Sequence, residues 1–174
     1  MHVTAIVLAA GKGKRLKSKS PKPLIEINSR PLIIYSLDTL SAHSGIRDII
    51  VVTNNKNSGS IVNKIGKYGV RKVKNIVLGG LRRQDSVQNA LKAIDKRTDL
   101  VLIHDAARPF ISKKMISSAL KTAKKYGVAI AGVPVKATIK EVTLPVRRQA
   151  GKSSSHQVTG LYAVKKTLKR DNLW

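Results

Sequence analysis

An apolar run near the start of the chain, followed by a basic loop with two glycines, constrains the fold more than any other feature. Residues 3–10 are apolar and rich in β-branched side chains, which predicts a buried strand of a parallel sheet. The GKGKR segment at 11–15 then lets the backbone approach an anion closely, and Pro21 and Pro23 restrict the loop around Lys22. We therefore predict a polyphosphate site at the carboxyl end of the first strand, where open α/β sheets bind ligands.

This loop differs from two familiar phosphate-binding loops. It lacks the third glycine of the dinucleotide fingerprint, and the chain contains no GxxxxGK[ST] sequence. A strand followed by AAGxGxR and then PKPL instead resembles the nucleotidyltransferases that join a nucleoside triphosphate to a phosphorylated small molecule. The alternative interpretation is a basic surface loop whose charges are only solvated.

Length and composition place the chain among ordinary globular proteins. With 174 residues and 42% hydrophobic content, we expect one compact domain over residues 1–174. No apolar run approaches the roughly 18 residues that cross a bilayer, and the basic cluster follows the apolar run rather than preceding it. The sequence has no cysteine, which excludes disulfides and thiolate metal sites. These features predict a cytoplasmic protein with no membrane partner.

The formal net charge of +25 is the most unusual global property. Such a field concentrates any polyanion, so it does not distinguish a nucleotide from a nucleic acid or an anionic lipid. Aromatic residues make up only 3% of the chain, which leaves few platforms for stacking bases. Because the basic residues are also spread along the sequence, we predict that nucleic acid is not the partner.

Strands and helices are predicted to alternate along the chain. Further strands are expected at 46–53, 73–78, 99–103 and 128–135, and helices after Pro31, at 58–68, around 87–94 and at 111–126. Asp85 or Ser86 is the predicted cap of the third helix, with Val87, Leu91 and Ile94 on its inner face. In the last helix Met115, Ile116 and Leu120 are among the residues expected to point inward, and Gly69 and Gly127 are predicted helix ends. The alternation predicts an α/β fold with a doubly wound, mostly parallel, Rossmann-like sheet.

Three chemically distinctive segments follow predicted strands: the 11–15 loop, Gly79-Gly80 and the HDAARPF segment at 104–110. In a parallel sheet they share one edge. The regular pattern ends after Glu141, where a basic, serine-rich stretch at 144–157 precedes a possible strand at 158–168. We expect a hairpin arm near residues 138–168, with an insert at about 141–168.

Four segments together carry a resemblance to one family. AAGKGKRL with PKPL, GGLRRQDSV, HDAARPF and VPVKATIK, in this order, resemble the 2-C-methyl-D-erythritol 4-phosphate cytidylyltransferases of non-mevalonate isoprenoid synthesis. The resemblance covers residues 3–142 and resumes at KKTLKRDNLW. It implies attack by a phosphate oxygen of the acceptor on the α-phosphorus of CTP, with pyrophosphate as leaving group. Both reactants are anions, so positioning and charge neutralisation dominate catalysis.

The resemblance also implies individual roles. Residues implied to stabilise charge or position the acceptor in catalysis are Arg15, Lys22 and Arg170, the last supplied across a dimer interface formed by the arm. Residues implied to bind the nucleotide are Ala9, Ala10, Gly11, Gly80, Arg83, Ser86 and Asp105. Residues implied to bind the acceptor are Asp105, Arg108, Thr138 and Lys140. Two bland alternatives stay open: Ser86 as a simple helix cap, and Asp105 with Arg108 as a salt bridge that closes a strand end.

Magnesium is the metal that the resemblance implies, held mostly by triphosphate oxygens with Asp105 as a protein ligand. His104 is interpreted as structural, because a phosphate monoester is already ionised near neutral pH and needs no general base. Ala137 stands where the family usually has aspartate, and the family continues past the position of Trp174 with a segment that this sequence lacks. Two alternatives are a cytidylyltransferase for ribitol 5-phosphate or another sugar phosphate, and an inactive nucleotide- or nucleic-acid-binding protein.

Overall fold

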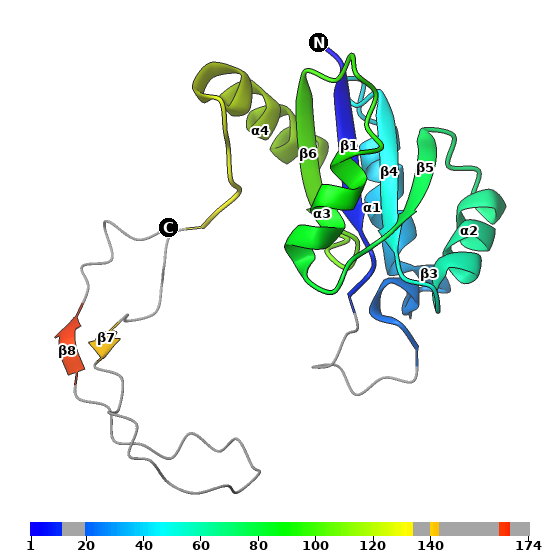
Figure 1. The fold of residues 1–174 in the computed structure, drawn as a ribbon, viewed down its shortest axis with the longest axis horizontal. Helices are drawn as coiled ribbons and strands as arrows, with labels where there is room; N and C mark the ends of the chain where they lie inside the picture. The colour runs from blue at the N-terminus through cyan, green and yellow to red at the C-terminus, as the bar shows by residue number, and fades with distance from the viewer. Residues whose placement is uncertain (12–19, 134–139, 143–163, 168–174) are drawn as a thin grey trace, which may run out of the picture. The chain divides into compact units, whose positions relative to one another are not determined.

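The computed structural model describes residues 1–11, 20–133, 140–142 and 164–167, and the chain divides into two units, residues 1–130 and 131–174. The first unit is an open α/β sheet with helices on both faces (Figure 1). The predicted fold class is therefore confirmed. Of the predicted site residues, Arg15, Thr138 and Arg170 lie outside the described residues.

The sheet has four strands, and all three pairings between them are parallel. They are β1 (Val3–Leu8), β4 (Asp48–Thr53), β5 (Val73–Leu78) and β6 (Leu100–Asp105), in the spatial order β5-β4-β1-β6. The chain therefore runs outward from β1 to β5 and then returns to the other side of β1. This reversal makes the carboxyl ends of β1 and β6 the topological switch point, which is where such sheets bind ligands.

The handedness of the connections decides which face each helix covers. The helices are α1 (Leu32–Ser41), α2 (Ser58–Lys67), α3 (Arg83–Leu91) and α4 (Lys113–Tyr126). Connections through α1 and α2 run in one direction along the sheet, and the connection through α3 runs back. Because crossovers between parallel strands are right-handed, α3 must lie on the opposite face from α1 and α2. Figure 1 shows α3 in front of the sheet and α1 behind it.

Alternate residues of the central strands fill two separate cores. Val3, Ala5 and Val7 of β1 are fully buried against side chains of α1, α2 and α4. Ile6, on the other face, packs in a smaller cluster with Ala90 of α3. The period of two follows from the pleat of a strand, and burial on both faces explains the continuous apolar run that predicted β1.

A short hairpin that the sequence pattern did not predict precedes α1. Its strands, β2 (Glu26–Ile27) and β3 (Arg30–Pro31), pair antiparallel across Asn28 and Ser29, both of which have positive φ. The Arg30 guanidinium forms an ion pair with Asp38 of α1 and lies 4.8 Å from the ring centre of Tyr68, just after α2. These contacts attach the hairpin to two helices.

The second unit contains one described ladder. Strand β7 (Lys140–Val142) pairs antiparallel with β8 (Val164–Thr167). The predicted hairpin, in which the 158–168 segment returns as a strand, is therefore confirmed for residues 164–167.

Two expectations about the end of the first unit and the residues after it are wrong. None of residues 128–133 is in a strand, and Val128, Ile130 and Val133 are 70%, 91% and 78% exposed. A strand needs a neighbour for its N–H and C=O groups, and the described part of the chain supplies none for residues 128–133.

Met115, expected to point inward, is half exposed, because the buried stripe of α4 runs through Ile116 and Leu120 instead.

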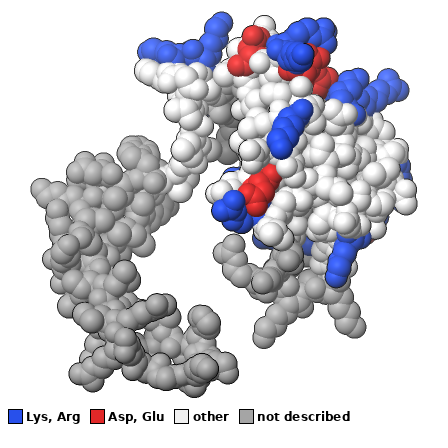
Figure 2. Space-filling view, viewed as in Figure 1, with Lys and Arg blue, Asp and Glu red and all other residues white. Residues whose placement is uncertain are grey.

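Charge on the described surface is dispersed, as the sequence predicted. In Figure 2 the lysine and arginine side chains occupy several separate places on this face, and acidic side chains lie directly beside some of them. Among the described residues no helix is long and apolar enough to cross a membrane.

Candidate functional site

The candidate site forms where the carboxyl ends of the strands meet. Leu8 lies opposite Val52 of β4 on one side and Asp105 of β6 on the other. Pairing continues one residue past each strand end: the Ala9 N–H donates to the Val52 carbonyl at 2.7 Å, and the Ala106 N–H donates to the Leu8 carbonyl at 3.0 Å. The sheet therefore holds the start of the first loop between two fixed neighbours.

The Gly79-Gly80 turn after β5 packs directly against this first loop. A β-carbon placed on Gly79 would lie 2.6 Å from the Ala10 β-carbon and 2.7 Å from the Ser86 hydroxyl oxygen, both far inside van der Waals contact. The Gly79 N–H also donates to the Thr53 carbonyl at 2.8 Å. Only glycine fits at this position. The Gly80 turn is therefore in contact with Ala9–Gly11, and both segments are predicted to bind the nucleotide.

Neither Asp85 nor Ser86 is the N-cap of α3, so the predicted cap of this helix is wrong. The N-cap is Arg82, whose N–H donates to the Asp85 carboxylate at 3.0 Å. Asp85 therefore occupies the third helical position, where a carboxylate also accepts from the cap. Its pKa is lowered by hydrogen bonds from the Arg82 side chain and backbone.

Ser86 instead forms hydrogen bonds to the turn that precedes α3. Its buried hydroxyl accepts from the Gly80 N–H at 3.1 Å and donates to the Arg82 carbonyl at 3.2 Å. The hydroxyl therefore fixes the backbone of the 80–82 turn. The oxygen keeps one unused lone pair, since a hydroxyl can accept two hydrogen bonds.

Asp105 brings residues from two motifs together. One of its oxygens lies 3.1 Å from a terminal nitrogen of Arg83, and the other lies 2.9 Å from Nε of Arg108. Arg83 is the first residue of α3, and Arg108 is in the turn after β6. The alternative interpretation, a salt bridge between Asp105 and Arg108, is therefore seen in the structure, and Arg83 joins it.

This cluster is suited to an anionic ligand. The Arg83 and Arg108 side chains are 64% and 78% exposed, whereas that of Asp105 is 33% exposed. Two guanidinium groups and one carboxylate leave a net charge of +1, with the cations on the solvent side. Guanidinium groups bind phosphate oxygens in a bidentate manner, so the arrangement can accept a phosphate without moving the strand ends.

The described residues fit magnesium only in a particular way. They contain no group of three or more His, Asp, Cys or Glu side chains that could hold a metal ion by itself. Magnesium bound to a nucleotide needs only one or two carboxylates, because phosphate oxygens and water supply its other ligands. Asp105 provides one carboxylate at the switch point, which fits that requirement.

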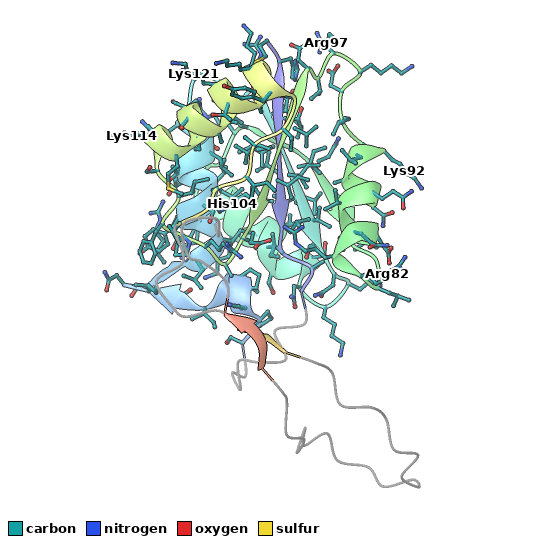
Figure 3. The ribbon with its side chains drawn as sticks, turned by 90° about the vertical axis from the view of Figure 1, so that its left-hand side faces the viewer. Arg82, Lys92, Arg97, His104, Lys114 and Lys121 are labelled. Carbon is teal, nitrogen blue, oxygen red and sulfur yellow. The ribbon has the colours of Figure 1, made fainter. Side chains whose placement is uncertain are left out.

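His104, which precedes Asp105 in β6, is 9% exposed and is labelled in Figure 3. Its Nε2 lies 3.1 Å from the Arg108 carbonyl oxygen and 3.2 Å from the Ser36 hydroxyl. Since a carbonyl only accepts, Nε2 carries the proton and donates. The ring therefore holds the turn after β6 to α1, which favours the structural interpretation.

Burial lowers the pKa of His104, and the hydrogen bond to the Arg108 carbonyl opposes this effect only in part. A histidine whose pKa is lower in the folded state stabilises the fold above its unfolded pKa of about 6.5. This stability is lost as pH falls below that value. We expect the urea midpoint of unfolding to decrease from pH 7.5 to pH 5, and His104→Gln to reduce this decrease.

The pKa of buried His43 is lowered by burial and by the charges of Lys72 and Lys113. His43 therefore also makes the urea midpoint decrease as pH falls. The slope in His104→Gln is therefore expected to be smaller than in the wild type but not zero. An unchanged slope in this variant would contradict the assignment of His104 as a buried neutral group.

Lys22 is placed by a short helix. Exposed Lys22 begins the 3₁₀ turn η1 (Lys22–Leu24), which packs next to α1, and Leu24 contacts the larger core. In Figure 1 the chain that leads from this turn to β3 lies at the same end of the sheet as the start of α3. Lys140, by contrast, belongs to β7 in the second unit.

Sequence reasoning missed two residues that build the site. Ser36, buried on the apolar face of α1, has its hydroxyl 3.4 Å and 3.3 Å from the carbonyl oxygens of Ala106 and Arg108. Asn54, after β4, has its side-chain amide 3.1 Å from the Ala10 carbonyl oxygen. The available signal was a polar residue at an otherwise apolar helical position, and an asparagine directly after a strand.

Comparison with protein families gives a match over nearly the whole chain. The family described as 2-C-methyl-D-erythritol 4-phosphate cytidylyltransferase (IspD) matches residues 3–174. Among curated relatives, a protein of that name from Clostridium botulinum (strain Langeland) is 44% identical over 137 residues, which are 79% of this chain and 60% of the relative. Another from Shouchella clausii is 38% identical over 174 residues, covering all of this chain and 68% of the relative.

Solved structures give the same result. A 4-diphosphocytidyl-2C-methyl-D-erythritol synthase from Anaerococcus prevotii aligns with a TM-score of 0.77 and 28% identity, over 98% of this chain and 64% of that chain. The 2-C-methyl-D-erythritol 4-phosphate cytidylyltransferase of Francisella tularensis aligns with a TM-score of 0.67 and 26% identity, over 100% and 69%.

The chain spans about 60% of the length of the Clostridium botulinum relatives that it matches. Its fold nevertheless agrees with that of the solved structures above. A family match over nearly the whole sequence and a relative 44% identical show that this chain belongs to the 2-C-methyl-D-erythritol 4-phosphate cytidylyltransferase family.

Proposed function

We propose that this chain binds CTP at the carboxyl edge of its sheet and transfers the cytidylyl group to 2-C-methyl-D-erythritol 4-phosphate, releasing pyrophosphate. The observation that carries the proposal is the contact of the Gly79-Gly80 turn and the Arg83–Asp105–Arg108 cluster with the strand ends around Ala10. The names of the relatives above concern this acceptor, so they lend no support to ribitol 5-phosphate or to a non-catalytic protein.

In the proposed reaction an oxygen of the acceptor phosphate attacks the α-phosphorus of CTP. The bond from that phosphorus to the bridging oxygen breaks, and pyrophosphate leaves with the electron pair. Because the second pKa of a phosphate monoester is about 6, the nucleophile is already anionic at neutral pH and no base is needed. The protein's task is to bring two anions together, which requires positive charge and fixed geometry.

The chain's own residues divide this task. The Ala9–Gly11 backbone and the Gly80 turn would line the nucleotide pocket, and Ser86 keeps that turn in place. Exposed Arg83 and Arg108 would bind phosphate oxygens, and Lys22 and Arg15 would neutralise charge at the α-phosphate and on pyrophosphate. Asp105 would hold the magnesium ion that accompanies CTP, and this ion offsets charge on the triphosphate when it is bound.

The acceptor side is proposed from the family resemblance. Thr138 and Lys140 would lie beside the acceptor phosphate, and Arg170 would reach it from the partner subunit of a homodimer formed through the arm. We place the reaction in the cytoplasm. The antiparallel pairing of β7 with β8 supports an arm of this kind.

A pyrophosphate-release assay with CTP, magnesium and 2-C-methyl-D-erythritol 4-phosphate tests the proposal. We expect turnover in the wild type and a decrease of at least about a hundredfold in Arg15→Ala, since oxyanion-stabilising groups contribute factors of this size. Lys92→Ala is the matched control, because exposed Lys92 lies at the opposite end of α3 from Arg82 (Figure 3). Wild-type turnover no higher than that of Arg15→Ala would contradict the proposed activity.

A further inference from the structure

Asn54 connects the first loop to the neighbouring strand end. It follows Thr53, the last residue of β4, and its side chain reaches toward β1. The amide nitrogen Nδ2 donates to the Ala10 carbonyl at 3.1 Å. The amide oxygen Oδ1 accepts from the Asn57 N–H at 3.1 Å. Both ends of the amide are therefore engaged.

Further hydrogen bonds hold the turn in which Asn54 lies. The Asn54 backbone carbonyl accepts from the Asn57 N–H at 3.1 Å and from the Ser58 N–H at 3.0 Å. Buried Asn57 is the N-cap of α2. Because the turn and the side-chain oxygen are both fixed, the amide nitrogen has one position left, and that position faces Ala10.

The hydrogen bond determines the direction of the next N–H group. In a planar trans peptide the C=O of Ala10 and the N–H of Gly11 point in opposite directions. All described peptide bonds are trans. Since Asn54 holds the Ala10 carbonyl toward the β4 side, the Gly11 N–H is directed away from β4. On the other side of β1 lies β6, which ends at Asp105.

We infer that Asn54 is a positioning residue for the nucleotide site: by holding the Ala10 carbonyl it orients the Gly11 N–H toward the bound phosphates. This inference rests on the proposed function, because it assumes that the Ala9–Gly11 backbone lines the CTP pocket. Open space above Gly11 is consistent with it, since a β-carbon there would meet no described atom within 4 Å.

Two substitutions separate this role from a purely structural one. Asn54→Asp keeps an acceptor for the Asn57 N–H but places an oxygen against the Ala10 carbonyl, so the two repel. Asn54→Ala removes both hydrogen bonds without repulsion. A carboxylate strengthens the hydrogen bond from the Asn57 N–H, which offsets this repulsion, so the urea midpoint of Asn54→Asp should be no lower than that of Asn54→Ala. Asn55→Asp is the matched control, because Asn55 is exposed and the charge change is the same.

We expect the CTP affinity, measured by titration calorimetry with magnesium, to decrease about fivefold in Asn54→Ala and about thirtyfold in Asn54→Asp. Asn55→Asp should stay within about twofold of the wild type. The variant that binds CTP more weakly is thus not the less stable one, a result that a merely structural residue would not produce. Affinities that follow the midpoints, or that equal the wild-type value, overturn the inference and leave the proposed function intact.

Hydrogen exchange tests the orientation step without CTP. In the free protein, exchange of the peptide that spans residues 3–11 should be faster in both Asn54 variants than in Asn55→Asp. Unchanged exchange there contradicts the anchoring of Ala10. If the wild type binds no CTP, the proposed function fails, and the inferred role of Asn54 fails with it.

Discussion

Replacing Gly79 with alanine is expected to lower the free energy of unfolding by about 2–3 kcal/mol and to abolish measurable CTP binding. The new β-carbon would lie 2.6 Å from the Ala10 β-carbon and 2.7 Å from the Ser86 hydroxyl. The Ala10 β-carbon cannot move without its backbone, so the first loop and the Gly79-Gly80 turn must separate, and the Ser86 hydroxyl must give up its hydrogen bond to the Gly80 N–H. Urea unfolding and calorimetric titration with CTP measure the two effects.

Gly66→Ala is the control for the glycine substitution itself. Gly66 lies inside α2, and a β-carbon there would meet no described atom within 4 Å. Alanine is the better helix former, so this variant should gain up to about 1 kcal/mol of stability and bind CTP as the wild type does. Equal stability of the two alanine variants would show that Gly79 is not packed as described.

The second large effect is expected for Asp105→Asn. Asparagine keeps the shape but removes the charge that holds Arg83 and Arg108 and the carboxylate proposed for magnesium. We expect kcat/KM for pyrophosphate release to decrease by at least about a hundredfold, the range found when a charge-stabilising group is lost. The urea midpoint should change little, because exposed ion pairs contribute little to stability.

Asp95→Asn is the matched control for Asp105. Asp95 also forms an ion pair with an exposed arginine, Arg97, but lies at the opposite end of the sheet, as Arg97 does in Figure 3. Hydrogen bonds from Arg97 keep the pKa of Asp95 well below its usual range, so this carboxylate is charged under the assay conditions. Asp95→Asn should retain activity. Equal losses of activity in the two variants would place the effect in overall charge rather than in the cluster.

The sheet could be predicted from the sequence because its strands are buried. Strand β5 begins and ends at the predicted residues, and β1, β4 and β6 differ from prediction by one or two residues at one or both ends. Apolar runs of this length reflect burial on both faces, which is a property of the final fold. Gly69 and Gly127 adopt positive φ after their helices, so these helix ends were also predictable.

Prediction of secondary structure failed where an element depends on contacts with distant residues rather than on its own sequence. The 128–133 segment has the composition of a strand but lacks a described neighbour. The β2–β3 hairpin has too few residues to show a period, and contacts of Arg30 with Asp38 and Tyr68 hold it. Asp85 was mistaken for a cap because acidic residues are common both at the cap and three residues later.

The site was predictable as a set of motifs but not as a set of contacts. The sequence placed Gly80, Arg83 and Asp105 near one edge of the sheet. It could not show that Arg83 pairs with Asp105, because the two are brought together only by the reversal of strand order. Asn54 was visible only as a polar residue after a strand, since its role depends on the distance to Ala10.

Helix α3 is the described helix that packs in the smaller of the two cores. Helix α3 buries only Ser86 and Ala90, whereas α1 buries most of its length. Regions with few buried apolar contacts open locally without global unfolding. Local opening of α3 would separate Arg83 from Asp105 and Ser86 from Gly80 at the same time while the larger core stays intact, so the ion-pair cluster and the turn before α3 share one unit of local stability.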